Sequence, residues 1–136
     1  MASDLAYEAT LALPFEAAIE RVTAALQSEG FGVLTRIDVQ ETLKKKIGAD
    51  FRPYVILGAC NPRLAHKALS SRSEVGLMLP CNVTVESAGE VTSLVRIADP
   101  AMMMTVGDLG SDAALQEVGA EAKTRLTRVI ESLRGA

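Results

Sequence analysis

The sequence is poor in the side chains that build stacking surfaces and imidazole-based sites. It has no tryptophan, two tyrosines, three phenylalanines and a single histidine, His66. Single-stranded nucleic acids and sugars usually bind on aromatic platforms, so few aromatics argue against such ligands. One histidine also excludes an active site that needs several imidazoles from the same chain.

The chain also lacks a basic stripe and a long apolar run. Its net charge is −3, its pI is near 5.2, and Lys44–Lys46 form the only cluster of cations. This balance argues against a nucleic-acid surface, where many cations replace phosphate counterions. No stretch approaches the roughly 18 to 20 apolar residues that cross a bilayer. The first ten residues, MASDLAYEAT, do not resemble a secretory signal, so we expect a cytoplasmic protein with reduced thiols.

What the sequence does contain is an alternation of strand and helix patterns typical of one globular domain. With 136 residues and 49% apolar composition, residues 1–136 are expected to form a single domain. Strands separated by helices of mixed length, with one hairpin, favour an α+β fold: two layers, with a mostly antiparallel sheet packed against helices. Strands are expected at 5–13, 31–39, 54–59, 82–87 and 91–97, with the hairpin turn at Ala88-Gly89.

Helix starts and stops are marked by cap residues and by proline. Pro14 suits a first helical turn, and Gly30 the end of that helix. Asp38, with Glu41 three positions later, has the form of a capping box for a short helix that Gly48 ends. Further starts are predicted at Asn61-Pro62 for a helix over 62–71, at Asp99-Pro100 for a short segment, and at Ser111 or Asp112 for a long helix.

Two strands carry predictions about their faces. In 31–39, Phe31, Val33, Ile37 and Val39 are expected on one face of the strand. The segment YVILGA, 54–59, is continuously apolar, which is typical of a strand covered on both faces.

Cys60 is the first candidate for chemistry. It stands one residue before the predicted helix start at Asn61, where the positive end of the helix dipole would lower its pKa. The alternative is that Cys60 closes an apolar strand and behaves as a small buried hydrophobe. Both interpretations stay open at this point.

Cys81 follows Pro80 and opens a strand, with no comparable activating feature. If its strand neighbours the one that ends at Cys60, the two thiols could approach each other. A disulfide would stabilise the fold by roughly 3 kcal/mol in the chain-entropy model, although a reducing compartment works against a permanent one. A transient redox pair is the alternative to a permanent disulfide.

His66 is a poor base for Cys60, since on a helix it lies about 7.5 Å further along the axis and rotated by roughly 140°. A surface histidine is the simpler interpretation. Two thiols, one imidazole and Met102–Met104 are ligand types that suit copper(I) or zinc. Their spacing matches no known metal motif, however, and methionines often fill cores. No cofactor is expected, and metal occupancy is left unassigned.

The phrases GFGVL, YVILGACNP, AHKAL and GLMLPCN, with Asp99-Pro100, occur in an order that resembles the domain-of-unknown-function family 302. The resemblance is densest over residues 30–85. It implies a compact α+β fold of small prokaryotic proteins that tend to form homodimers. It places Cys60, Asn61, Pro62, His66, Pro80, Cys81 and Asn82 on motif positions. The family has no settled activity, so no catalytic role is carried over.

The leading functional hypothesis is a homodimer that binds a small ligand or a protein partner near the GACNP and LPCN segments. Asn61 and Asn82 could present side-chain amides there, and helix-start N–H groups could hold an anion; local capping and turn geometry is the simpler role for both asparagines. The runner-up is thiol-dependent redox or soft-metal handling by Cys60 and Cys81. A purely structural interaction module is the third possibility. No nucleic acid, membrane or catalytic constellation is predicted.

Overall fold

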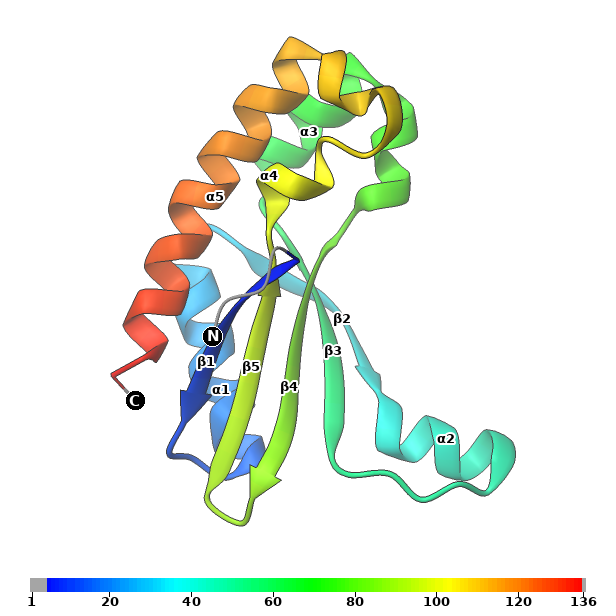
Figure 1. Ribbon diagram of the computed structural model, residues 1–136, viewed down its shortest axis with the longest axis vertical. Coiled ribbons are helices and arrows are strands. Elements are labelled where there is room, and N and C mark those ends of the chain that lie inside the picture. The colour runs from blue at the N-terminus through cyan, green and yellow to red at the C-terminus, as the bar shows by residue number, and fades with distance from the viewer. Residues whose placement is uncertain (1–4, 136) are drawn as a thin grey trace.

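The computed structural model describes residues 5–135; residues 1–4 and 136, at the ends of the predicted domain, lie outside the described part. Strands and helices alternate along the chain (Figure 1). The strands are β1 (Ala6–Leu11), β2 (Gly32–Asp38), β3 (Tyr54–Cys60), β4 (Cys81–Gly89) and β5 (Thr92–Ala98). The helices are α1 (Phe15–Ser28), α2 (Val39–Ile47), α3 (Pro62–Ser71), α4 (Pro100–Met103) and α5 (Ala113–Leu133), with 3-10 turns η1 (Ser73–Met78) and η2 (Gly107–Ser111).

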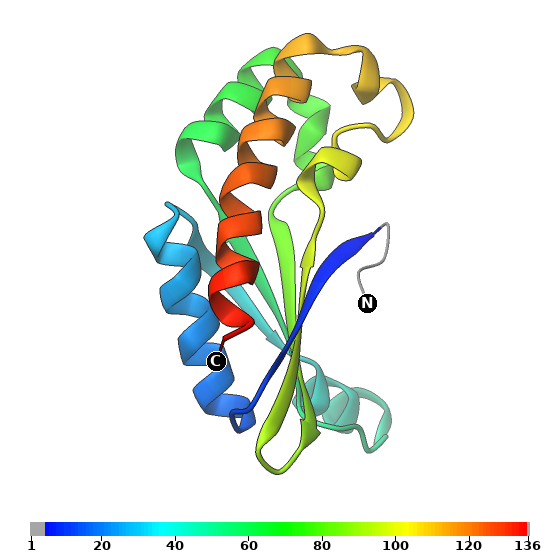
Figure 2. The ribbon, with the colours of Figure 1, turned by 60° about the vertical axis from the view of Figure 1, so that its left-hand side comes forward.

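The five strands form one sheet in the order β1-β5-β4-β3-β2, and every neighbouring pair is antiparallel. Helices α1 and α5 lie on one side of this sheet, and α2 lies on the other (Figure 2). The α+β prediction with a mostly antiparallel sheet is therefore confirmed. Within the described residues, no helix is long and apolar enough to span a bilayer.

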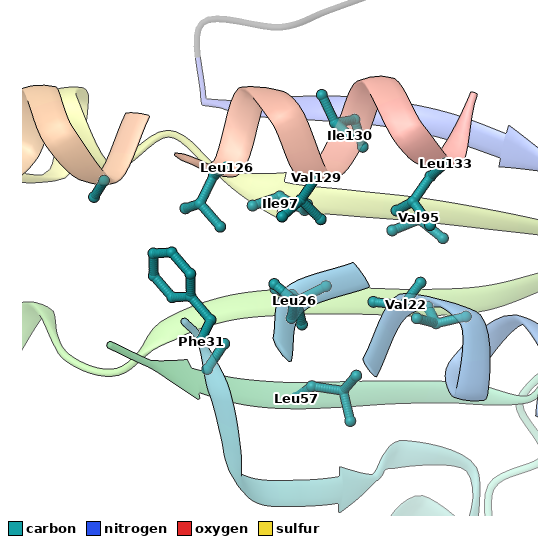
Figure 3. Close-up of a cluster of buried hydrophobic side chains, with 14 of the residues drawn as sticks. Val22, Leu26, Phe31, Leu57, Val95, Ile97, Leu126, Val129, Ile130 and Leu133 are labelled. Carbon is teal, nitrogen blue, oxygen red and sulfur yellow. The ribbon is translucent and has the colours of Figure 1, made fainter. Parts of the chain in front are cut away.

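The core lies between the sheet and helices α1 and α5 (Figure 3). Alternate strand residues, such as Leu57 of β3 and Ile97 of β5, point into it and are at most 1% exposed. Leu26 of α1 and Leu126 of α5 meet them with no exposed surface. Each such side chain contributes about 1.5–3 kcal/mol through removal of apolar surface from water.

The predicted cap residues begin the helices. The Asp38 side chain accepts from the Glu41 N–H at 2.9 Å, and the Asn61 side chain from the Leu64 N–H at 3.3 Å. Asp99 caps α4. Of the two candidates for α5, Asp112 makes the cap bond, to the Leu115 N–H at 3.1 Å, whereas Ser111 belongs to η2. Caps are local, which explains why the sequence predicted them.

Several boundaries differ from the prediction, most by one or two residues. The first strand is confined to Ala6–Leu11 rather than 5–13. Pro14 is the cap residue before α1, with extended backbone, and not its first helical residue. The hairpin turn lies at 90–91, because the pairing of β4 and β5 continues to Gly89 opposite Thr92.

The prediction that Phe31, Val33, Ile37 and Val39 share one face of the second strand is wrong. Phe31 is buried, but Ile37 is 49% exposed, and Val39 already belongs to α2. The register of β2 shifts between Val33 and Thr35, so the alternation of faces breaks there. Residues 32–53, from β2 through α2 to the start of β3, contain no buried residue. We call this segment the arm, and the rest of the described chain the body.

The expectation that the third strand is covered on both faces is also wrong for this chain. Val55, Leu57 and Ala59 point into the core. Tyr54 and Ile56, on the opposite face, are only partly buried, because no helix of the body covers that side of the sheet. We call it the open face.

Candidate functional site

Three segments singled out in the sequence, GACNP, LPCN and Asp99-Pro100, meet at one end of the sheet. Because neighbouring strands are antiparallel, the end of β3 at Cys60 lies beside the beginning of β4 at Cys81, and β5 also ends there, before Asp99-Pro100. Helices α3 and α4 start from this end (Figure 1). The GACNP, LPCN and DP segments therefore converge, as the hypothesis of a common site requires.

A small apolar cavity of about 30 Å³ lies at this convergence. Its volume suits one or two water molecules, but an apolar lining tends to keep such a cavity dry. The residues around it come from the end of the sheet and from α3, α4 and α5: Phe31, Ala59, Cys60, Asn61, Leu64, Ala65, Ala68, Leu79, Cys81, Pro100, Met104, Val118, Gly119 and Ala122. Two of the predicted strand-end residues, Cys60 and Cys81, thus border the same space.

The register of the sheet decides how the two cysteines relate. Cys81 pairs with Ala59, whose side chain is in the core. Cys60 is therefore offset by one residue from the position that pairs with Cys81. In a regular ladder this offset directs adjacent side chains to opposite faces. Both cysteines are free thiols. The strands are neighbours, as the redox hypothesis requires, but the thiols are not paired across the ladder.

The environment of the thiols opposes easy ionisation. Burial raises the pKa of Cys60, the opposite of the lowering that its place before a helix suggested. Burial, with a smaller contribution from the nearby Cys60, raises the pKa of Cys81 to about 11. Because burial raises both pKa values above the ordinary value for cysteine, both thiols are protonated at neutral pH.

Asn61 joins the cavity to an open cleft beside the start of α3. Its side chain caps α3 and packs under Gly30, where a Cβ would lie 3.1 Å from the Asn61 amide nitrogen and where φ is +84°. The cleft measures about 370 Å³ and also touches Pro62, Arg63, Glu121 and Arg125. Asn61 is the one predicted site residue that borders both spaces.

Arg125 is held at the cleft by two contacts. Its guanidinium donates to a Glu121 carboxylate oxygen at 3.2 Å and to the Glu29 carbonyl at 3.2 Å. Among the described residues, Arg63 forms no ion pair. Sequence analysis missed both arginines, because Arg125 reaches the cleft from α5 and no local pattern links it to Asn61.

Asn82 lies elsewhere. It is exposed, sits opposite Gly58, and borders a hollow of about 310 Å³ on the open face, together with Tyr54, Pro80 and Arg96. The close approach here explains Gly58, since a Cβ at this position would clash with the Thr35 hydroxyl and lie 2.8 Å from Pro80 Cγ. The structure therefore does not bring Asn82 into the space that Asn61 borders.

His66 is exposed on α3 and does not border the cavity, in agreement with the expected surface position. Met104 is 3% exposed and fills the core beside the cavity, which confirms core filling for this methionine. In residues 5–135, no group of three or more histidine, cysteine, aspartate or glutamate side chains is arranged to hold a metal ion.

A second cluster was not anticipated. Tyr7 of β1 lies near Asp99, the cap of α4, and Lys123 of α5, whose ammonium is 3.8 Å from the carboxylate of Asp99. Burial, with the charge of Asp99, raises the pKa of the Tyr7 hydroxyl. These residues are 92 and 24 positions apart in the chain, so only tertiary packing brings them together.

Comparison with known families agrees with the resemblance in the motifs. The sequence model described as "Domain of unknown function DUF302" matches residues 7–133. The chain belongs to the DUF302 family. Comparison with curated proteins found no significant match.

A solved DUF302 structure has the same fold. It is the crystal structure of an uncharacterized conserved DUF302 protein from Bacillus stearothermophilus, with 33% sequence identity and a TM-score of 0.83. The alignment covers 97% of this chain and 100% of that one. The DUF302 assignment therefore extends over nearly the whole chain, and the candidate site lies well inside it.

Proposed function

We propose that this DUF302 domain binds a small anionic ligand that carries a short apolar group. The observation that supports the proposal is that Asn61 borders both an apolar cavity and a cleft with two guanidinium groups. The apolar group would occupy the cavity, and the anionic group would lie against Arg63 and Arg125. The proposal includes no catalytic step.

The cleft is electrostatically suited to an anion. Two arginines and one glutamate leave it with a net positive charge. It also lies at the beginning of α3, where the positive end of the helix dipole favours negative charge. A guanidinium group can bind a carboxylate or phosphate with two parallel hydrogen bonds. Arg63, free of an ion pair within the described residues, is the better placed of the two to do so.

The dimensions restrict the ligand. The cavity of about 30 Å³ admits a group no larger than one or two carbon atoms. The cleft of about 370 Å³ lies at the lower end of the range for small-molecule sites, roughly 300–1,000 Å³. A short carboxylic acid or a small phosphate ester has this shape and charge.

Thermal unfolding with a panel of short aliphatic carboxylates and phosphate esters tests this. A ligand at one hundred times its Kd should stabilise the fold by about 2.7 kcal/mol. Arg63→Glu should abolish the stabilisation, whereas Lys67→Glu, an exposed charge reversal on the same helix, should retain it. Equal stabilisation of both variants, or no stabilisation by any member of the panel, would overturn the proposal.

Soft-metal handling is a second candidate, favoured by one observation: Cys60, Cys81 and the thioether-bearing Met104 border the same cavity. Redox exchange is less well supported, because it requires thiolates and burial raises both pKa values. A soft metal can displace the thiol protons on binding. Native mass spectrometry with copper(I), on wild type and on the Cys60→Ser and Cys81→Ser variants, should show one ion bound only when both thiols are present.

We also propose that the protein is a cytoplasmic homodimer that binds neither nucleic acid nor membranes. The net charge of −3 supports the absence of a nucleic-acid surface. Sedimentation equilibrium tests the dimer, and the carboxylate panel can be applied whether or not the protein dimerises. The two parts of the proposal can therefore fail separately.

A further inference from the structure

The arm is folded but places no fully buried side chain in the core, against which only partly buried side chains such as Val33 pack. None of its 22 residues, 32–53, is buried. Three of its large apolar side chains are exposed to solvent: Leu34 is 66% exposed, Ile37 49% and Ile47 73%. Ordering each residue costs roughly 1–2 kcal/mol in backbone entropy. A nine-residue helix such as α2 is marginal by itself, so an amphipathic segment of this kind normally packs against another surface.

The open face of the sheet is the second surface that is only partly covered: Arg52 of the same chain lies over the Tyr54 ring and pairs with Glu86, but no helix of the body packs there. The apolar run of β3 is typical of a strand buried on both sides, yet Tyr54 and Ile56 are only partly buried. Across the sheet, Thr84 of β4 and Leu94 of β5 are also only partly buried. The hollow of about 310 Å³ between Tyr54 and Met103 lies on this face. The arm projects from the same side, away from α1 and α5 (Figure 2).

The two surfaces carry opposite charge. The arm has five basic and three acidic residues, a net charge of +2. On the open face, the carboxylates of Glu8 and Glu86 surround Arg96 and leave a net charge of −1; Glu86 also pairs with Arg52 at the end of the same chain's arm. Complementary charge favours contact between an arm and a body rather than between two arms.

We infer that a second copy of this chain covers both surfaces, with the arm of each copy lying against the open face of the other. The inference rests on the proposed homodimer and names its interface. In a dimer with twofold symmetry, both arms are bound, because each arm contacts the open face of the partner.

The far edge of the sheet is a less suitable interface. There, Arg134 of α5 donates to the Glu8 carbonyl of β1 at 3.2 Å, so part of that edge is already occupied. The exposed Leu77 of η1, at 83%, belongs to the opposite end of the molecule and is not continuous with the arm. Leu77 therefore provides a matched control.

The experiment is sedimentation equilibrium on the full chain, comparing wild type with Ile47→Glu, Leu34→Asp and Leu77→Glu. We expect a dimer for wild type and for Leu77→Glu. Each arm variant should weaken dimerisation at least roughly 100-fold, because it would bury an unpaired carboxylate at the interface. Circular dichroism should show that the arm variants stay folded, since neither side chain is buried in the single chain.

Hydrogen exchange on wild type provides a readout without mutation. Amides of residues 32–47 and of the open-face strands should become more protected as protein concentration rises through the dimer Kd. A monomeric wild type would overturn the homodimer and this interface together, leaving ligand binding untouched. A dimer that the arm variants leave intact, or that Leu77→Glu disrupts, would overturn this interface alone. Binding of another protein by a monomer would likewise overturn it.

Discussion

In the body, every strand and every helix has at least one buried residue, whereas β2 and α2 of the arm have none. The local sequence does not separate the two regions, since Asp38 caps α2 in the same way as Asn61 caps α3. The difference is one of packing. Capping and turn chemistry suffice to shape a segment, but burial decides how much that segment contributes to stability.

The largest expected difference concerns apolar truncation. Leu26→Ala, in the body, removes a side chain with no exposed surface and should cost about 2–5 kcal/mol of unfolding free energy. Ile47→Ala, in the arm, should change it by less than about 0.5 kcal/mol at a dilution where the chain is monomeric. Urea unfolding measures both. A similar cost at the two positions would show that the arm packs in the monomer.

Gly58 links the two regions, because it lies between Thr35 of the arm and Pro80 of the body. Gly58→Ala should cost about 1–3 kcal/mol through overpacking, since the added Cβ meets both neighbours. Combining Gly58→Ala with Thr35→Ala or with Thr35→Ser separates the clash with the hydroxyl of residue 35 from the clash with Pro80. Thr35→Ala removes this hydroxyl, whereas Thr35→Ser keeps it. The glycine substitution should therefore cost less beside alanine at position 35 than beside serine. Urea unfolding of the four chains provides the comparison.

The raised thiol pKa of Cys81 predicts a pH dependence that belongs to the body. The unfolded chain loses this proton near the ordinary value, whereas the folded chain holds it up to about pH 11. Stability is thus fully present below the ordinary pKa of 9.0 and falls as pH rises towards 11. The expected loss attributable to Cys81 by pH 10 is about 1.4 kcal/mol.

Urea unfolding in reductant at about pH 8 and pH 10 measures this loss, with Cys81→Ala as the reference that lacks the thiol. Other groups titrate in both chains and cancel in the difference. Alkylation gives a second readout: iodoacetamide should modify both cysteines slowly at neutral pH and rapidly only after denaturation. Fast labelling of folded Cys60 below pH 7 would contradict the protonated thiol and strengthen the redox hypothesis.

The smallest expected effect compares the two caps. Asn61→Ala should cost about 1 kcal/mol of global stability, because α3 packs against α5 in the body. Asp38→Ala removes an equivalent cap bond, but in the monomer it should mainly fray α2 and leave the urea midpoint nearly unchanged. Amide exchange in residues 39–47 would report that local loss. Equal shifts of the midpoint would mean that α2 unfolds together with the core.

Local chemistry was enough to predict most of the elements. The caps at Asp38, Asn61 and Asp99 and the helix over 62–71 depend on neighbours three or four positions away, so the sequence contains all the partners. The redox hypothesis required the strands that carry Cys60 and Cys81 to be neighbours. The antiparallel pairing of β3 and β4 meets this requirement. The roles of Cys60, Asn61, His66, Cys81 and Asn82 stay predictions.

Tertiary structure decided what depends on distant partners. The offset of Cys60 from Cys81 follows from a register that residues along the whole of β3 and β4 set together. The rise in both thiol pKa values follows from burial, which a helix-start argument does not include. Arg125 reaches the cleft beside Asn61 from α5, far along the chain. The sequence by itself determined where helices begin and which fold class they build, because those interactions are short in range. The charge, strand register and exposure of the site were decided only by tertiary packing, because they depend on residues that are far apart in the chain.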